Sequence, residues 1–122
     1  MKRAKLPLLY LVLASVASVP IWLQAHAAAR PGPRVIEISA RRFGFTPREI
    51  TLKKGEPVTL RLSTEDVKHG FFVKALNLDA DIIPGTTSEI TFTPQTTGKF
   101  VSVCDNFCGS GHGDMRMTIV IE

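Results

Sequence analysis

The chain lacks the runs of basic residues that mark nucleic-acid-binding proteins. It contains 15 Lys and Arg residues and 11 Asp and Glu residues, and three of the basic ones are Lys2, Arg3 and Lys5 at the N-terminus. Without those three, 12 basic residues stand against 11 acidic ones, which is a net charge of +1. The sequence pI of about 9.4 therefore says nothing about nucleic acid, and we expect no such partner.

Tryptophan and tyrosine are also scarce, and a helical pattern of apolar residues is missing beyond the first 27 residues. The single Trp22 and the single Tyr10 both lie in the first 27 residues, so phenylalanine is the only aromatic residue type in the rest of the chain. That part has no apolar pattern of sustained helical period, no internal repeat and no low-complexity tract. These absences leave β-strands as the expected elements of a single domain.

The first 27 residues have the pattern of a secretory signal. The basic residues are followed by an apolar stretch from Leu6 to Leu23, and Ala25-His26-Ala27 matches the small-x-small pattern of a signal-peptidase site. We expect residues 1–27 to be a cleaved signal peptide. The apolar stretch is close to the ~20 residues that span a bilayer, so an uncleaved membrane anchor is the alternative. Residues 28–34 then form a linker and residues 35–122 the domain.

Apolar and polar residues alternate with a period of two in several short segments of the domain. The strands that this pattern predicts cover residues 36–39, 50–53, 58–63, 90–92, 99–103 and 117–121. Glycine and proline signal turns at residues 54–57, 84–85 and 97–98. Short strands with one apolar face each predict an all-β fold, a two-sheet antiparallel β-sandwich with Greek-key connections.

Both cysteines and both histidines of the domain can belong to one site. Cys104, Cys108 and His112 are spaced four residues apart in a run that continues to Met115, and His69 lies upstream. Thiolate, imidazole and thioether groups are soft ligands that favour copper over magnesium or calcium. All of these residues fall at predicted strand ends or in the loop before the last strand, and a sandwich can gather such loops at one end.

The same residues allow other interpretations. In an oxidising compartment, Cys104 and Cys108 would by default form a disulfide. Two cysteines with two histidines are also a structural zinc set. A blue-copper centre needs only one cysteine, two histidines and a weak axial ligand. The second thiolate suits instead two coppers bridged by both sulfurs, each completed by one imidazole.

The sequence resembles a known copper site at two places. The stretch Cys104–Met115 is similar to the Cys-x3-Cys-x3-His-x2-Met signature of the CuA centre of cytochrome c oxidase subunit II, a centre that also occurs in nitrous oxide reductase. The segment Asp66–Phe71 resembles the Asp-Val-x-His-x-Phe segment of that family. The resemblance runs from about Val35 to the C-terminus, is closest to the compact, single-anchor type of subunit II, and implies a cupredoxin-like sandwich.

The resemblance also implies a ligand set for two copper ions. Its members are His69, Cys104, Asn106, Cys108, His112 and Met115. The two thiolates would bridge both ions. His69 and Met115 would complete one copper, and His112 with the main-chain carbonyl of Asn106 would complete the other. Many family members have Glu where this chain has Asn106; a main-chain ligand tolerates that change, but the family's magnesium site, which uses the Glu side chain, is not expected.

The expected function is electron transfer by an exported, periplasmic protein, soluble or anchored by one N-terminal helix. The resemblance implies a donor such as a c-type cytochrome and a haem-bearing oxidase subunit I as the acceptor. The chain lacks the two-helix membrane hairpin of the commoner subunit II and, in its domain, the tryptophan and tyrosines through which that family receives electrons. These departures do not involve the candidate copper ligands.

Two functions other than electron transfer are compatible with these residues. A periplasmic copper carrier that holds labile Cu(I) is the alternative. An enzyme acting alone ranks third, because a fully ligated copper pair has no open position for a substrate.

Four acidic residues could form a rim for a basic cytochrome or be solvated loop charges: Asp79, Asp81, Asp105 and Asp114.

Overall fold

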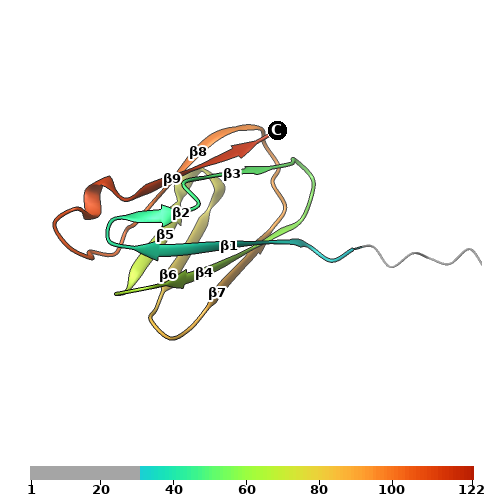
Figure 1. Ribbon diagram of the computed structural model, residues 1–122. Helices are drawn as coiled ribbons and strands as arrows, with labels where there is room; N and C mark the ends of the chain where they lie inside the picture. The colour runs from blue at the N-terminus through green and yellow to red at the C-terminus, as the bar shows by residue number, and fades with distance from the viewer. Residues whose placement is uncertain (1–30) are drawn as a thin grey trace, which may run out of the picture. The chain divides into compact units, whose positions relative to one another are not determined.

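Nine β-strands in two sheets make up residues 31–122, the part of the chain that the computed structural model describes (Figure 1). The expected signal peptide or anchor at residues 1–27 and the first three residues of the expected linker lie outside the described residues. Within residues 31–122, no helix is long and apolar enough to cross a membrane.

The first sheet has four strands in the order β2-β1-β4-β7. They are β1 (Arg34–Arg41), β2 (Gly44–Thr46), β4 (Val58–Thr64) and β7 (Ser88–Phe92). β1 pairs with β2 and β4 with β7 in antiparallel fashion, whereas β1 and β4 are parallel. The parallel pair arises because the chain leaves this sheet after β2, passes through the second sheet and returns as β4, which runs in the same direction as β1.

The second sheet has five strands in the order β3-β9-β8-β5-β6. They are β3 (Glu49–Leu52), β5 (His69–Val73), β6 (Leu78–Ile82), β8 (Gly98–Val103) and β9 (Arg116–Ile121). β3 and β9 are parallel, and the other neighbours are antiparallel. Two short 3-10 helices, η2 (Lys74–Leu76) and η3 (His112–Asp114), complete the secondary structure of the described residues.

The core lies between the two sheets and consists of the inward-facing residue of each alternating pair. In β9, Met117, Ile119 and Ile121 are buried while the residues between them are not. Phe45 and Phe71 meet across the core with their ring centroids 5.9 Å apart and their planes nearly perpendicular, the edge-to-face arrangement that aromatic pairs favour. Period-two alternation is therefore what encodes this core.

The predicted two-sheet, cupredoxin-like sandwich is confirmed, with one correction to its strand directions. The sheets are not wholly antiparallel, since each contains the one parallel pair that its crossover requires. His69, expected in a loop, is instead the first residue of β5.

One end of the sandwich gathers the candidate ligands. β8 ends there, β5 and β9 begin there, and the loop of residues 104–115 projects from it (Figure 1). The chain enters β1 at the opposite end, where β9 finishes. The two sheets therefore act as a rigid base for the ligand loop.

A matched pair of substitutions tests this core. Ile119 is fully buried, and Ile83, the residue after β6, is 46% exposed. We expect Ile119→Ala to lower the free energy of unfolding by about 2–5 kcal/mol, because it leaves a cavity between the sheets. We expect Ile83→Ala to change it by less than about 1 kcal/mol. Urea unfolding followed by circular dichroism measures both, and equal effects would contradict the described core.

Candidate metal centre

The first half of the site joins β5 to the end of β8. His69 begins β5, and Cys104 follows β8 directly. The Nδ1 atom of His69 lies 3.9 Å from the Sγ atom of Cys104, and both residues are buried. The backbone N–H of Gly70 points at the same sulfur across 3.4 Å. This half of the site therefore presents one imidazole nitrogen and one thiol in a dry environment.

The second half of the site is supplied by the loop alone. The Sγ atom of Cys108 lies 3.9 Å from Nδ1 of His112 and 4.0 Å from Sδ of Met115. Met115 is fully buried, whereas His112 is half-buried. The arrangement repeats the first half, since each sulfur faces one imidazole nitrogen at 3.9 Å.

The two halves meet at the sulfur pair. The Sγ atoms of Cys104 and Cys108 are 3.9 Å apart, and both cysteines are free. The donor atoms of His69, Cys104 and Cys108 all lie within 4.8 Å of one another. The carbonyl oxygen of Asn106 lies 3.2 Å from the sulfur of Cys104. The structure thus brings together all six residues that the sequence singled out.

The sulfur separation fits a shared metal better than a disulfide. A disulfide bond is about 2.05 Å long. A metal–thiolate bond is about 2.3 Å long, so an ion bonded to both sulfurs can span 3.9 Å without moving either of them. The donors are also the soft set that copper prefers.

The ligand loop is closed by main-chain hydrogen bonds. The N–H of Cys104 donates to the carbonyl of Met115 across 3.2 Å, and the N–H of Met115 donates to the carbonyl of His112 across 3.2 Å. Gly109 has φ = +140°, a conformation that residues with a side chain rarely adopt. A Cβ atom at Gly111 would lie 2.5 Å from the ring of Phe43. The glycines therefore let the loop turn tightly while a ring packs on its backbone.

Asp66 orients the first histidine. Its Oδ1 atom lies 2.8 Å from Nε2 of His69, which leaves Nδ1 facing the sulfurs. Burial alone would raise the pKa of Asp66, but hydrogen bonds from the N–H groups of Arg42 and Val67 and from the His69 ring outweigh it and hold that pKa well below its usual range. A charged carboxylate behind a ligating imidazole fixes both its tautomer and its orientation.

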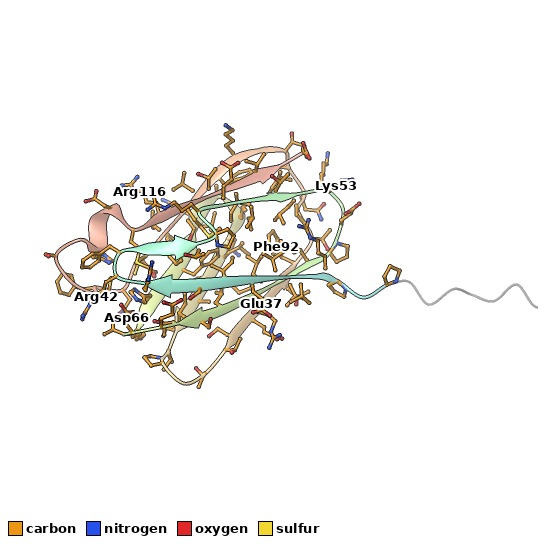
Figure 2. All side chains as sticks on the ribbon, viewed as in Figure 1. Glu37, Arg42, Lys53, Asp66, Phe92 and Arg116 are labelled. Atoms are coloured by element: carbon orange, nitrogen blue, oxygen red, sulfur yellow. The ribbon has the colours of Figure 1, made fainter. Side chains whose placement is uncertain are left out.

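Arg42 connects the two halves of the site from outside. Its backbone N–H donates to Oδ2 of Asp66 across 2.8 Å, and its Nε donates to the carbonyl of Cys108 across 2.8 Å. Figure 2 shows Arg42 and Asp66 at the ligand-bearing end of the sandwich. Neither residue was among the predicted site residues. Asp66 has a local signal, three residues before His69, but Arg42 is 66 residues from Cys108 and has none.

The thiol of Cys108 is held in its neutral form. Burial and the adjacent Cys104 raise the pKa of Cys108 from its ordinary 9.0 to about 11, although Arg42 acts in the opposite direction. A thiol ligates metal as the thiolate. Metal binding at this site must therefore displace a proton that the folded protein holds firmly.

The chain is similar to known proteins in both sequence and structure. The cupredoxin-like domain family matches residues 11–121. Cytochrome c oxidase subunit 2 of Thermus thermophilus is 31% identical over 100 residues, which are 80% of this chain and 74% of that protein. A chain in the cryo-EM structure of a heme-copper terminal oxidase dimer is 30% identical, with a TM-score of 0.67 over 75% of this chain and 66% of that one.

A third similarity concerns the fold alone. The periplasmic domain of cytochrome oxidase subunit II from Bradyrhizobium japonicum has a TM-score of 0.67 at 21% identity, over 73% of this chain and 83% of that one. The range that the family matches, residues 11–121, spans the positions of all six candidate ligands. The chain therefore belongs to the cupredoxin-like family, as a copper-binding domain related to cytochrome c oxidase subunit II.

Proposed function

We propose that the domain transfers single electrons through a binuclear copper centre of the CuA type. The observation that carries the proposal is the pair of buried sulfurs 3.9 Å apart, each facing one imidazole nitrogen. The residues that would hold the two ions are His69, Cys104, Asn106, Cys108, His112 and Met115. Copper bound there would supply a one-electron couple.

The protein would fix the ligands in position and shield them from water. His69 and Met115 are fully buried, and Cys104 and Cys108 are 4% and 5% exposed. The hydrogen bond between Cys104 and Met115 fixes both ends of the loop, and Asp66 fixes one imidazole. Ligands that are already in place need little rearrangement when an electron arrives or leaves, which favours fast transfer.

The partners follow from the family and from the exposed side of the site. His112 is the half-buried ligand, and the ring of Phe107 beside it is 77% exposed. Electrons would therefore pass through this side of the loop. A periplasmic donor such as a c-type cytochrome and a haem-bearing oxidase subunit I fit the relationship to subunit II. The domain alone would not catalyse a reaction, because its histidines are committed to copper.

Copper loading tests the proposal directly. We expect the purified protein to bind two coppers per chain and to turn intensely purple, with an EPR hyperfine pattern of one unpaired electron shared by both ions. Cys104→Ser and Cys108→Ser should each abolish that pattern, because a thiolate that would hold the copper is lost. Metal analysis, optical absorption and EPR measure these outcomes. A blue mononuclear signal, or tight binding of zinc in place of copper, would contradict the binuclear assignment.

A copper carrier is the second candidate, and one observation favours it. Cys108 lines an open cavity of about 280 Å³ together with Arg42, Lys68 and Phe107, which offers a route for an ion to the thiol. A carrier would hold one colourless Cu(I) and release it rapidly to a Cu(I) chelator such as bathocuproine disulfonate. An electron-transfer centre would keep both ions over the same time.

Met115 and Met117 form a matched pair for testing the weak ligand. Both are buried, but only Met115 has its sulfur at the site, 4.0 Å from Cys108. We expect Met115→Leu to shift the reduction potential and the absorption maximum of the copper-loaded protein, because a soft thioether donor is removed. Met117→Leu should leave both unchanged, since it alters only the core. Equal effects would mean that Met115 is no ligand.

The raised pKa of Cys108 predicts how the metal-free protein responds to pH. The neutral thiol is favoured in the folded state, so its contribution to stability is complete below pH 9 and is lost as the pH rises towards about 11. We expect alkylation of Cys108 by iodoacetamide to be slow at pH 8 and to accelerate only towards that value. Mass spectrometry follows the reaction, with the urea-unfolded protein as the control. A folded-state midpoint near or below that of the unfolded protein would disprove the raised pKa.

A further inference from the structure

Three arginines converge on one cavity beside the metal site. The cavity has a volume of about 230 Å³ and is lined by Arg41, Arg42, Phe43 and Arg48, with the remaining lining residues uncharged. It lies where β1 turns into β2 and where the chain then leads to β3. No acidic residue lines it.

Most of this positive charge is not neutralised within the described residues. Arg41 lies 3.9 Å from Glu65, but both side chains are more than half exposed, and such surface pairs contribute little. Arg48 has no hydrogen-bond or ion-pair partner for its side chain among residues 31–122. Arg42 uses only Nε, on the carbonyl of Cys108, and so keeps most of its N–H donors free.

The cavity is continuous with the loop that carries the ligands. Phe43, which lines it, packs its ring on the backbone of Gly109 and Gly111 and is 42% exposed. Arg42 binds the loop through Cys108. A molecule seated at the arginines would therefore touch residues that are in direct contact with the copper-binding loop.

We propose that this surface, defined by Arg41, Phe43 and Arg48, docks an acidic patch on the protein that exchanges electrons with the domain. Guanidinium groups pair strongly with carboxylates, and complementary charge raises the rate of encounter between proteins. Phe43 supplies an apolar contact at the side nearest to the loop. The inference rests on the proposed electron transfer and adds the chemistry of the partner.

The acidic residues at this end do not form a competing rim. Asp81 is paired with Lys68 at 3.0 Å. Asp66 is turned inward onto His69 and backbone amides. Asp105 and Asp114 are exposed single charges on the ligand loop. A cluster of unpaired charge is thus found on the arginine side, which favours an acidic partner over a basic one.

Charge reversal at Arg41 and Arg48 tests the proposal. The copper-loaded protein is mixed in a stopped-flow instrument with a reduced acidic c-type cytochrome or a reduced basic one, over a range of ionic strengths. We expect the acidic cytochrome to react faster at low salt and to slow as salt is added. R41E/R48E should lower that rate by about tenfold or more. The matched control K53E/K54E carries the same change of charge at the other end of the sandwich, where Figure 2 shows Lys53, and should stay within about twofold of the wild type.

Three outcomes would overturn the docking surface. The first is a faster reaction with the basic cytochrome at low salt, and the second is an equal loss of rate in R41E/R48E and K53E/K54E. The third is saturable binding of inorganic phosphate alone at the arginines, with no effect of either cytochrome, which would make this a small-anion site.

The docking readout does not depend on the copper centre. Binding of the acidic cytochrome to the metal-free, ¹⁵N-labelled protein is measured by NMR and should perturb the amides around Arg41 and Arg48 but not those around Lys53. If copper loading yields no binuclear signal while this perturbation appears, the proposed function is wrong and the docking surface stands. If the binuclear centre forms and no perturbation of the amides appears, the proposed function stands and the docking surface is wrong.

Discussion

The site depends on one main-chain hydrogen bond, from the N–H of Cys104 to the carbonyl of Met115. It continues the β8–β9 pairing by one further step and so brings the two ends of a twelve-residue loop together. The chain between those ends forms a closed loop, and the thiols of Cys104 and Cys108 lie 3.9 Å apart within it. The sheets supply the stability, and the loop, which lacks regular strands, supplies most of the ligands.

Residues far apart in the sequence contact that loop directly or support the residues that do. His69 reaches it from β5, and Asp66 stands behind the imidazole. Arg42 ties Asp66 to the carbonyl of Cys108, so the β1–β2 turn braces both sides of the centre. Hydrogen bonds to main-chain groups and to one carboxylate thereby hold the site in shape around the two sulfurs.

The period-two alternation of apolar and polar residues predicted the strands that have one exposed and one buried face, such as β9. It did not predict the strands in which this contrast is weak. In β5, four of the five residues from His69 to Val73 are buried, so the strand shows no alternation. In β6, alternation is present, but its exposed positions are Asp79 and Asp81, and aspartate is depleted in strands. β2 is only three residues long. The six candidate ligands could be proposed because their chemistry and spacing are visible in the sequence, and they remain a prediction. Arg42 was missed because only tertiary folding brings it to Cys108.

The direction of β1 has a practical consequence. The strand starts at Arg34, at the end of the sandwich farthest from the ligand loop, and runs its eight residues towards the site. At about 3.3 Å per residue, roughly 25 Å of sheet separate that starting point from the turn that braces the centre. A domain attached to an electrode or a resin through its N-terminal side would accordingly present its candidate metal site to the solution.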